Sequence, residues 1–122
     1  GMFKTFGQHF LVEYMGCEAD RIAFVGPVRE ALLRAAEESR ATILETFFHQ
    51  FEPKGVSGML FIAESHFSIH TWPEDGYAAF DVLTCGRMEP EKAVESLRKS
   101  LGARDVRCRV VSRGYGPEGG SA

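Results

Sequence analysis

Two neighbouring segments of the chain alternate apolar and reactive side chains with a period of two. In the first segment, 66–70, Phe67 and Ile69 alternate with the polar side chains of His66, Ser68 and His70. In the second, 77–85, apolar side chains at even positions alternate with a set that includes Tyr77, Asp81 and Cys85. Successive side chains of a β-strand point to opposite faces of its sheet. Both segments are therefore predicted strands with one apolar face and one reactive face.

Helical periodicity is confined to two other segments. The first follows Gly26 and Pro27, and its apolar residues recur at helical spacing at Val28, Ala31, Leu32 and Ala35. The second begins at Pro90 and stops at Gly102, a residue type that often ends helices, with apolar residues at Ala93, Val94, Leu97 and Leu101. Each helix is thus predicted to have one apolar side.

The remaining regular segments are predicted strands at 8–16, 41–51, 56–63, 66–72, 77–85 and 104–112. Two amphipathic helices can cover only one face of such a sheet. We therefore predict an α+β fold, a two-layer sandwich in which a mainly antiparallel sheet carries two helices on one face. The other face is predicted to hold the polar chemistry.

Size and composition narrow the class of protein. The chain has 122 residues, the usual size of one domain, so 1–122 is interpreted as a single domain. A formal net charge of −3 disfavours a nucleic-acid partner, which usually requires a basic stripe. Three cysteines without a CxxC pair fit a reducing compartment, and no apolar run reaches the roughly 20 residues that cross a bilayer. We predict a cytoplasmic protein without a membrane partner, ending in a flexible Gly-rich tail at 114–122.

The densest group of reactive side chains lies between residues 64 and 86. It contains two serines, two histidines, a tryptophan, a cysteine and several carboxylates. The residues alone leave three interpretations open: a histidine that activates a serine or cysteine, a pair of histidine metal ligands, or a polar sheet face. A hydrolase is disfavoured because the region has no G-x-S-x-G motif. In an extended strand His66 and His70 would lie roughly 13 Å apart, so no metal site is predicted.

The same region resembles the processing and active-site signature of the prokaryotic S-adenosylmethionine decarboxylases. The similarity rests on Glu-Ser-His-Phe-Ser-Ile-His-Thr-Trp-Pro-Glu at 64–74, Tyr-Ala-Ala-Phe-Asp at 77–81 and Thr-Cys-Gly at 84–86. It extends to shorter stretches elsewhere, at 7–9, 41–43, 48–51 and 55–58. The resemblance implies a proenzyme that cleaves itself between Glu64 and Ser65 into a β chain, 1–64, and an α chain, 65–122.

The resemblance also implies roles in self-cleavage. The Ser65 hydroxyl would attack the Glu64 carbonyl and turn the amide into an ester, and His70 would then remove the Ser65 α-proton. The ester would leave, and the resulting dehydroalanine would hydrolyse to a pyruvoyl group. Ser57 would assist by hydrogen-bonding the intermediate. A neutral imidazole, with an ordinary pKa of about 6.5, is a competent base at neutral pH.

One geometric condition accompanies this assignment. Ser65 and His70 are five residues apart, so a straight strand would place their side chains on opposite faces of the sheet. Either the chain turns or bulges at residues 64–66, which is the prediction for a self-cleaving peptide, or His70 acts on Ser65 after a local rearrangement.

Further roles in the mature enzyme follow from the same resemblance. The pyruvoyl ketone would form a Schiff base with the substrate amine, which removes the need for pyridoxal phosphate. Cys85 would return a proton to the substrate, since a thiol with an ordinary pKa of about 8.5 is mostly protonated at pH 7. Phe51 and Trp72 would stack on an adenine ring, and Glu74 would hold the ribose hydroxyls.

The implied activity is decarboxylation of S-adenosylmethionine by a homodimer of processed protomers, supplying the aminopropyl donor for spermidine and polyamine synthesis. One alternative is a pyruvoyl-dependent arginine or ornithine decarboxylase, in which Phe51, Trp72 and Glu74 would lose their purpose. The other is an unprocessed paralogue that acts as a regulatory subunit. His66 is interpreted as structural, and Glu13 and Asp81 receive no role.

Overall fold

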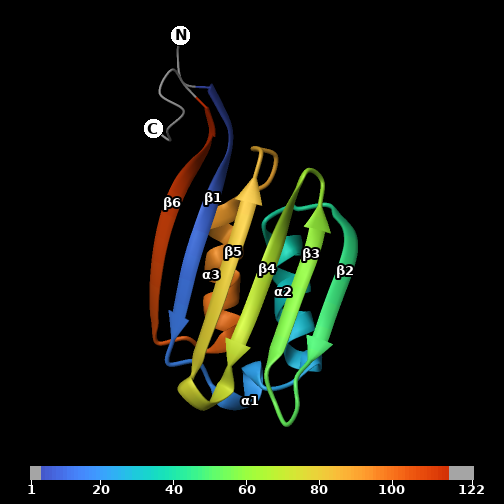
Figure 1. Ribbon diagram of the computed structural model, residues 1–122, viewed down its shortest axis with the longest axis vertical. Coiled ribbons are helices and arrows are strands. Elements are labelled where there is room, and N and C mark those ends of the chain that lie inside the picture. Colours follow the sequence, from blue (N-terminus) through green and yellow to red (C-terminus); the bar gives the residue numbers. More distant parts are fainter. Residues whose placement is uncertain (1–3, 116–122) are drawn as a thin grey trace.

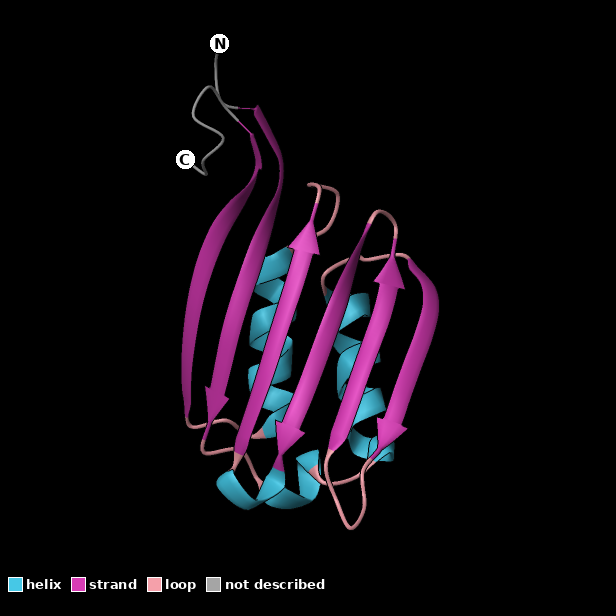
Figure 2. Ribbon diagram, viewed as in Figure 1, coloured by secondary structure: helices cyan, strands magenta, loops and turns pink. Residues whose placement is uncertain are grey.

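A computed structural model describes residues 4–115 as one antiparallel sheet backed by helices (Figure 1). The strands of this part of the chain are β1 (Lys4–Met15), β2 (Ile43–Gln50), β3 (Val56–Ile62), β4 (Ser65–Trp72), β5 (Tyr77–Thr84) and β6 (Asp105–Tyr115). Their order in the sheet is β2-β3-β4-β5-β1-β6, with antiparallel neighbours throughout. The helices are α1 (Ala19–Ile22), α2 (Val25–Glu38) and α3 (Pro90–Leu101), with a 3-10 turn η1 (Pro73–Asp75). Helices α2 and α3 lie on the same face of the sheet (Figure 2), which confirms the predicted α+β sandwich.

The core lies between the sheet and helices α2 and α3. Phe67 of β4 and Phe80 of β5 are buried there with Leu32 of α2 and Leu97 of α3. Burial alternates along β4 and β5 as the period of two predicts. The face turned away from the helices is called the open face, and it carries the polar positions of that alternation: His66, Ser68, His70 and Asp81.

Helices α2 and α3 lie where the sequence predicts them. α2 begins at Val25, so Pro27 falls in its first turn. The N–H groups of a first turn have no acceptor within the helix, so proline, which lacks an N–H, costs no hydrogen bond there. α3 runs from Pro90 to Leu101, and Gly102 follows it with a φ of 64°, the left-handed conformation that glycine adopts most easily. Within residues 4–115, no helix has the length and apolar character to cross a membrane.

Several boundaries differ from the predictions. The sequence does not predict α1, because its four residues are too few to show a helical period. β1 begins at Lys4 instead of residue 8, since its first residues pair with the end of β6. β6 extends to Tyr115, so residues 114 and 115 belong to a strand and not to the predicted tail. The rest of that predicted tail, 116–122, lies outside the described residues.

The chain reverses direction at the predicted cleavage point. Ile62 ends β3, Ser65 begins β4, and these two residues pair across the hairpin. Only Ala63 and Glu64 connect them, and they form a tight turn. Of the predicted alternatives, the structure therefore contains a turn, and the Glu64–Ser65 peptide lies at the junction between this turn and β4.

Gly58 of β3 provides a test of the packing beneath the sheet. A Cβ atom at this position would lie 2.5 Å from Cε1 of Phe48 on β2. We expect Gly58→Ala to lower the free energy of unfolding by about 1–3 kcal/mol, because the ring has to shift. Urea denaturation measures the change. Gly26→Ala in α2 is the matched control, since its added Cβ meets no atom within 4 Å. Equal loss of stability in both variants would contradict the packing described for Phe48.

Candidate active site

Three predicted residues meet at the turn between β3 and β4. The Ser65 hydroxyl donates to Sγ of Cys85 at 3.8 Å, and the Cys85 thiol donates to the Glu64 carbonyl at 3.5 Å. Cys85 directly follows β5, so the pairing of β4 with β5 brings the thiol to the turn. Glu64, Ser65 and Cys85 are called the cleavage cluster. Their contacts place a hydroxyl nucleophile and a proton-bearing thiol against the same peptide bond.

A second group of predicted residues lies at the other end of β4. Ser57 and His70 are paired across β3 and β4, and Ser57 Oγ lies 2.6 Å from His70 Nδ1, within hydrogen-bonding distance. These two residues line one cavity of about 270 Å³ together with Phe51, Trp72 and Glu74. The five residues are called the aromatic cluster.

The aromatic cluster presents ring faces to solvent. Phe51 and Trp72 are 47% and 42% exposed, so part of each ring is accessible to a ligand. Trp72 stacks on Tyr77 with ring centroids 5.2 Å apart, and this contact fixes one side of the indole. Phe51 packs edge-on against His49. The cavity therefore combines aromatic surface with the Glu74 carboxylate and a serine–histidine pair.

The two clusters are separate within one chain. Ser65 and His70 lie five residues apart along the regular strand β4, which corresponds to roughly 16 Å. Their partners on β3 keep the same separation, since Ser65 pairs with Ile62 and His70 with Ser57. The turn at Glu64 does not bring His70 back toward Ser65. The structure thus groups the predicted site residues into two sets and does not bring the imidazole to the scissile bond.

A third group on the open face is centred on Asp81. Its carboxylate accepts hydrogen bonds from the Ser68 hydroxyl and from Nε2 of both His9 and His66, and Arg113 lies 3.2 Å from the other ring nitrogen of His9. Partial burial acts to raise the pKa of Asp81, but the hydrogen bonds from Ser68, His9 and His66 outweigh it and hold the pKa below its ordinary value. These five residues are called the Asp81 network.

The sequence contains only part of the signal for this network. The alternation in β4 and β5 places His66, Ser68 and Asp81 on one face, so their proximity follows once these strands pair. His9 lies 72 positions before Asp81 in the chain. The two residues meet because β1, which carries His9, pairs with β5 in the sheet. The periodicity of a sequence does not indicate the order of strands in a sheet, so the sequence does not predict that His9 and Arg113 join this network.

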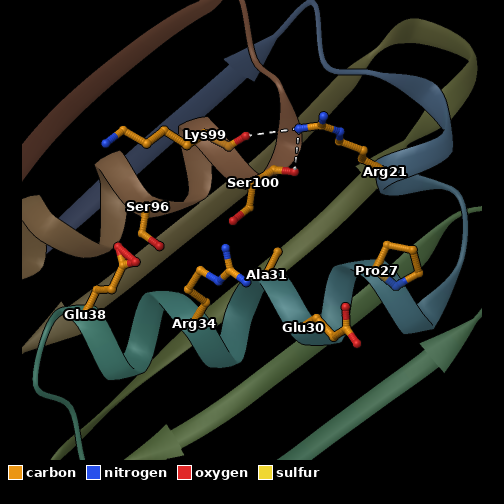
Figure 3. A pocket seen from close by; sticks show the side chains of 9 residues that line it. All are labelled: Arg21, Pro27, Glu30, Ala31, Arg34, Glu38, Ser96, Lys99 and Ser100. Atoms are coloured by element: carbon orange, nitrogen blue, oxygen red, sulfur yellow. Dashed lines mark hydrogen bonds between the residues drawn. The ribbon is translucent and has the colours of Figure 1, made fainter.

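A separate polar groove lies on the helical side of the molecule (Figure 3). It occupies about 340 Å³ between α2 and α3, and the Ser96 hydroxyl on its wall is buried without a hydrogen-bond partner in the described structure. Arg21 donates to the carbonyl oxygens of Lys99 and Ser100 at its edge. Among the residues that line this groove, none belongs to the cleavage cluster, the aromatic cluster or the Asp81 network.

The fold and the open face define a small two-layer α+β enzyme domain. Residues 8–114 match the family described as S-adenosylmethionine decarboxylase. The chain belongs to the S-adenosylmethionine decarboxylase family, as the resemblance in its sequence indicates.

Individual relatives are similar to this chain over almost its whole length. It is 42% identical over 115 residues to the S-adenosylmethionine decarboxylase proenzyme of Pyrococcus horikoshii, a match that covers 93% of this chain and 83% of the relative. The proenzyme of Pelotomaculum thermopropionicum is 44% identical, with 94% and 92% of the two chains covered. The crystal structure of the adenosylmethionine decarboxylase from Aquifex aeolicus VF5 superimposes with a TM-score of 0.85 at 37% identity, covering 91% of this chain and 92% of that one.

Proposed function

We propose that this chain cleaves itself between Glu64 and Ser65 and then decarboxylates S-adenosylmethionine, using a pyruvoyl group formed from Ser65. The product would serve as the aminopropyl donor in spermidine synthesis. The single observation that carries the proposal is the cleavage cluster, in which Cys85 contacts both the Ser65 hydroxyl and the Glu64 carbonyl. The names of the relatives as decarboxylase proenzymes support it.

The cleavage cluster fits the first step of this reaction. The Ser65 oxygen attacks the Glu64 carbonyl carbon, the C–N bond breaks, and an ester joins the two residues while the released amine gains a proton. The thiol of Cys85 donates to the carbonyl oxygen on which negative charge develops during the attack. Removal of the Ser65 α-proton then expels the Glu64 carboxylate, and hydrolysis of the remaining enamine releases ammonia.

The residues present also fit the pyruvoyl group itself. Residue 65 lies at the end of a strand beside a free thiol, so a carbonyl formed there has a proton donor next to it. Bound at this position, the group would supply a carbonyl that takes up the electrons released as carbon dioxide leaves. Cys85 would deliver the proton that replaces the carboxylate. This role requires a free thiol, which supports a reducing, cytoplasmic setting.

The separation of the two clusters leads us to propose a homodimer with shared active sites. Two open faces packed together, with their strands running in opposite directions, would place the aromatic cluster of one copy beside the β3–β4 turn that carries the cleavage cluster of the other. A two-fold axis would generate two identical composite sites. Exposed aromatic side chains on β2 and β3, Phe47 and Phe61, pack edge-on at a centroid distance of 6.0 Å and supply apolar surface for such an interface.

The aromatic cluster supports an adenosyl substrate over a simple basic amino acid. Exposed rings at Phe51 and Trp72 can stack on adenine and attract the sulfonium cation. The Glu74 carboxylate in the same cavity can accept hydrogen bonds from two ribose hydroxyls. Arginine and ornithine contain neither a purine nor a ribose, so these groups would have no counterpart on them.

Variants of the cleavage cluster test the proposed activity through release of carbon dioxide. We expect Ser65→Ala to remain inactive because residue 65 cannot become a carbonyl. Cys85→Ala is expected to lose roughly 100-fold or more of the decarboxylation rate, the usual contribution of a positioned general acid. Cys108→Ala is a matched control, since Cys108 is also an exposed free cysteine but lies on β6.

Each variant is assayed with S-adenosylmethionine, arginine and ornithine. The proposal requires carbon dioxide from the first substrate only. Normal decarboxylation by Cys85→Ala would refute its role as proton donor, and release from arginine or ornithine would refute the substrate assignment.

Co-expression of two inactive variants tests the shared site. Ser65→Ala lacks the residue that is cleaved, and His70→Ala lacks the proposed base, so each variant alone is expected to stay uncleaved. In a mixed dimer, the intact Ser65 of one copy would meet the intact His70 of the other. We therefore expect cleavage of the His70→Ala chain only when both variants are expressed together, measured by denaturing mass spectrometry. Mixed dimers that form and stay uncleaved would contradict the composite site.

A further inference from the structure

The Asp81 network lies directly next to the residue that is cleaved. His66 follows Ser65 in the chain, and its Nε2 lies 3.3 Å from Oδ2 of Asp81. The Ser68 hydroxyl donates to the other carboxylate oxygen, so Asp81 holds two successive open-face positions of β4 from the neighbouring strand β5. The side chains of Asp81 and His66 are 19% and 27% exposed. Limited contact with water makes these hydrogen bonds effective constraints on the first residues of β4.

The directions of the hydrogen bonds show how the Asp81 carboxylate holds the side chains around it. The Arg113 guanidinium has only donors, so Nδ1 of His9 accepts from it and the proton of a neutral His9 lies on Nε2. This Nε2–H donates to Asp81, which also accepts from His66 and Ser68. The carboxylate is thus satisfied by three donors in its ionised form.

The ligand atoms of His9, His66 and Asp81 lie within 4.8 Å of one another. Two imidazoles and a carboxylate are a kind of donor set that binds transition metals. A cation there would have to displace the proton on Nε2 of His9. A ligating histidine also normally donates its second N–H to an acceptor, whereas the second nitrogen of His9 faces the Arg113 guanidinium. The arrangement of donors therefore favours the hydrogen-bonded network over a metal centre.

We propose that Asp81 is a positioning residue that acts through His66 to hold residue 65 beside Cys85. The inference rests on the proposed function. Before cleavage, residue 65 is held covalently by Glu64 on one side and by His66 on the other. Once the Glu64–Ser65 bond is broken, residue 65 is joined covalently to the sheet through His66 alone, and chain ends at the last pair of a hairpin fray easily. The hydrogen bond from His66 to Asp81 restrains the side chain of the residue that directly follows this new end.

The test compares Asp81→Asn and His66→Phe with the wild-type enzyme. We expect slower self-cleavage in both variants and, for the cleaved enzyme, a kcat reduced by roughly tenfold or more with little change in KM, because a displaced carbonyl at residue 65 reacts poorly while the aromatic cluster still binds substrate. Glu95→Gln is the matched control. Its carboxylate also accepts two hydrogen bonds, both from Arg98, but it lies on α3, so its rates should equal those of the wild type.

Two readouts separate positioning from general loss of structure. His66→Gln keeps an N–H donor at the end of the side chain and is expected to retain more activity than His66→Phe. If Asp81 acts through His66, the double variant should lose little more activity than His66→Phe alone, since coupled residues give non-additive effects. Melting temperatures of all variants identify any that fail to fold, and His66→Gln then serves as the milder test.

The outcomes distinguish the two proposals. The positioning role would be overturned if Asp81→Asn kept the kcat and the cleavage rate of the wild type. It would also be overturned if the fold-losses of kcat in the two single variants multiplied in the double variant. Either result would leave the proposed function intact. A wild-type enzyme that neither cleaves nor decarboxylates would overturn both.

Discussion

The register of β4 between β3 and β5 determines where every reactive group lies. It pairs Ser57 with His70 on one side and places Ser68 opposite Asp81 on the other. It also brings Ser65 to the end of the hairpin, within reach of the thiol that follows β5. A slip of one residue would turn His66, Ser68 and His70 toward the helices and expose Phe67. Burial of Phe67 against the helices therefore also fixes the chemistry of the open face.

Much of this arrangement could be predicted from the sequence, because its signals are local. Alternation in β4 and β5 identified the buried and open faces, and the apolar stripes with Pro27, Pro90 and Gly102 located α2 and α3. Information on strand order is not local. The sheet places β1 between β5 and β6, and this long-range pairing brings His9 and Arg113 to Asp81.

In the candidate site, too, some features could be predicted from local sequence signals and others depend on how the strands pair. The five-residue spacing of Ser65 and His70 indicated opposite faces of a straight strand, and the structure adds that the turn at Glu64 leaves them at opposite ends of β4. The contact of Cys85 with Ser65 and Glu64 depends on how β4 and β5 pair, so only the structure reveals it. The roles of these residues in catalysis remain predictions that experiments on the protein can test.

A one-sided sheet gives a physical reason for the proposed division of the site between two copies. Helices α2 and α3 cover one face, while the open face leaves aromatic side chains such as Phe47 and Phe61 exposed to water. A small domain gains stability by burying such a face against a second copy. The same contact would exclude water from the reacting groups and join the aromatic cluster of one chain to the cleavage cluster of the other.

In the proposed self-cleavage, Ser65 ceases to be a serine and becomes a pyruvoyl group. Denaturing mass spectrometry of the purified wild-type protein tests it directly. We expect two fragments, one ending at Glu64 and one beginning at residue 65 with a carbonyl in place of its amino group. A single intact chain that retains Ser65 after prolonged incubation would contradict it.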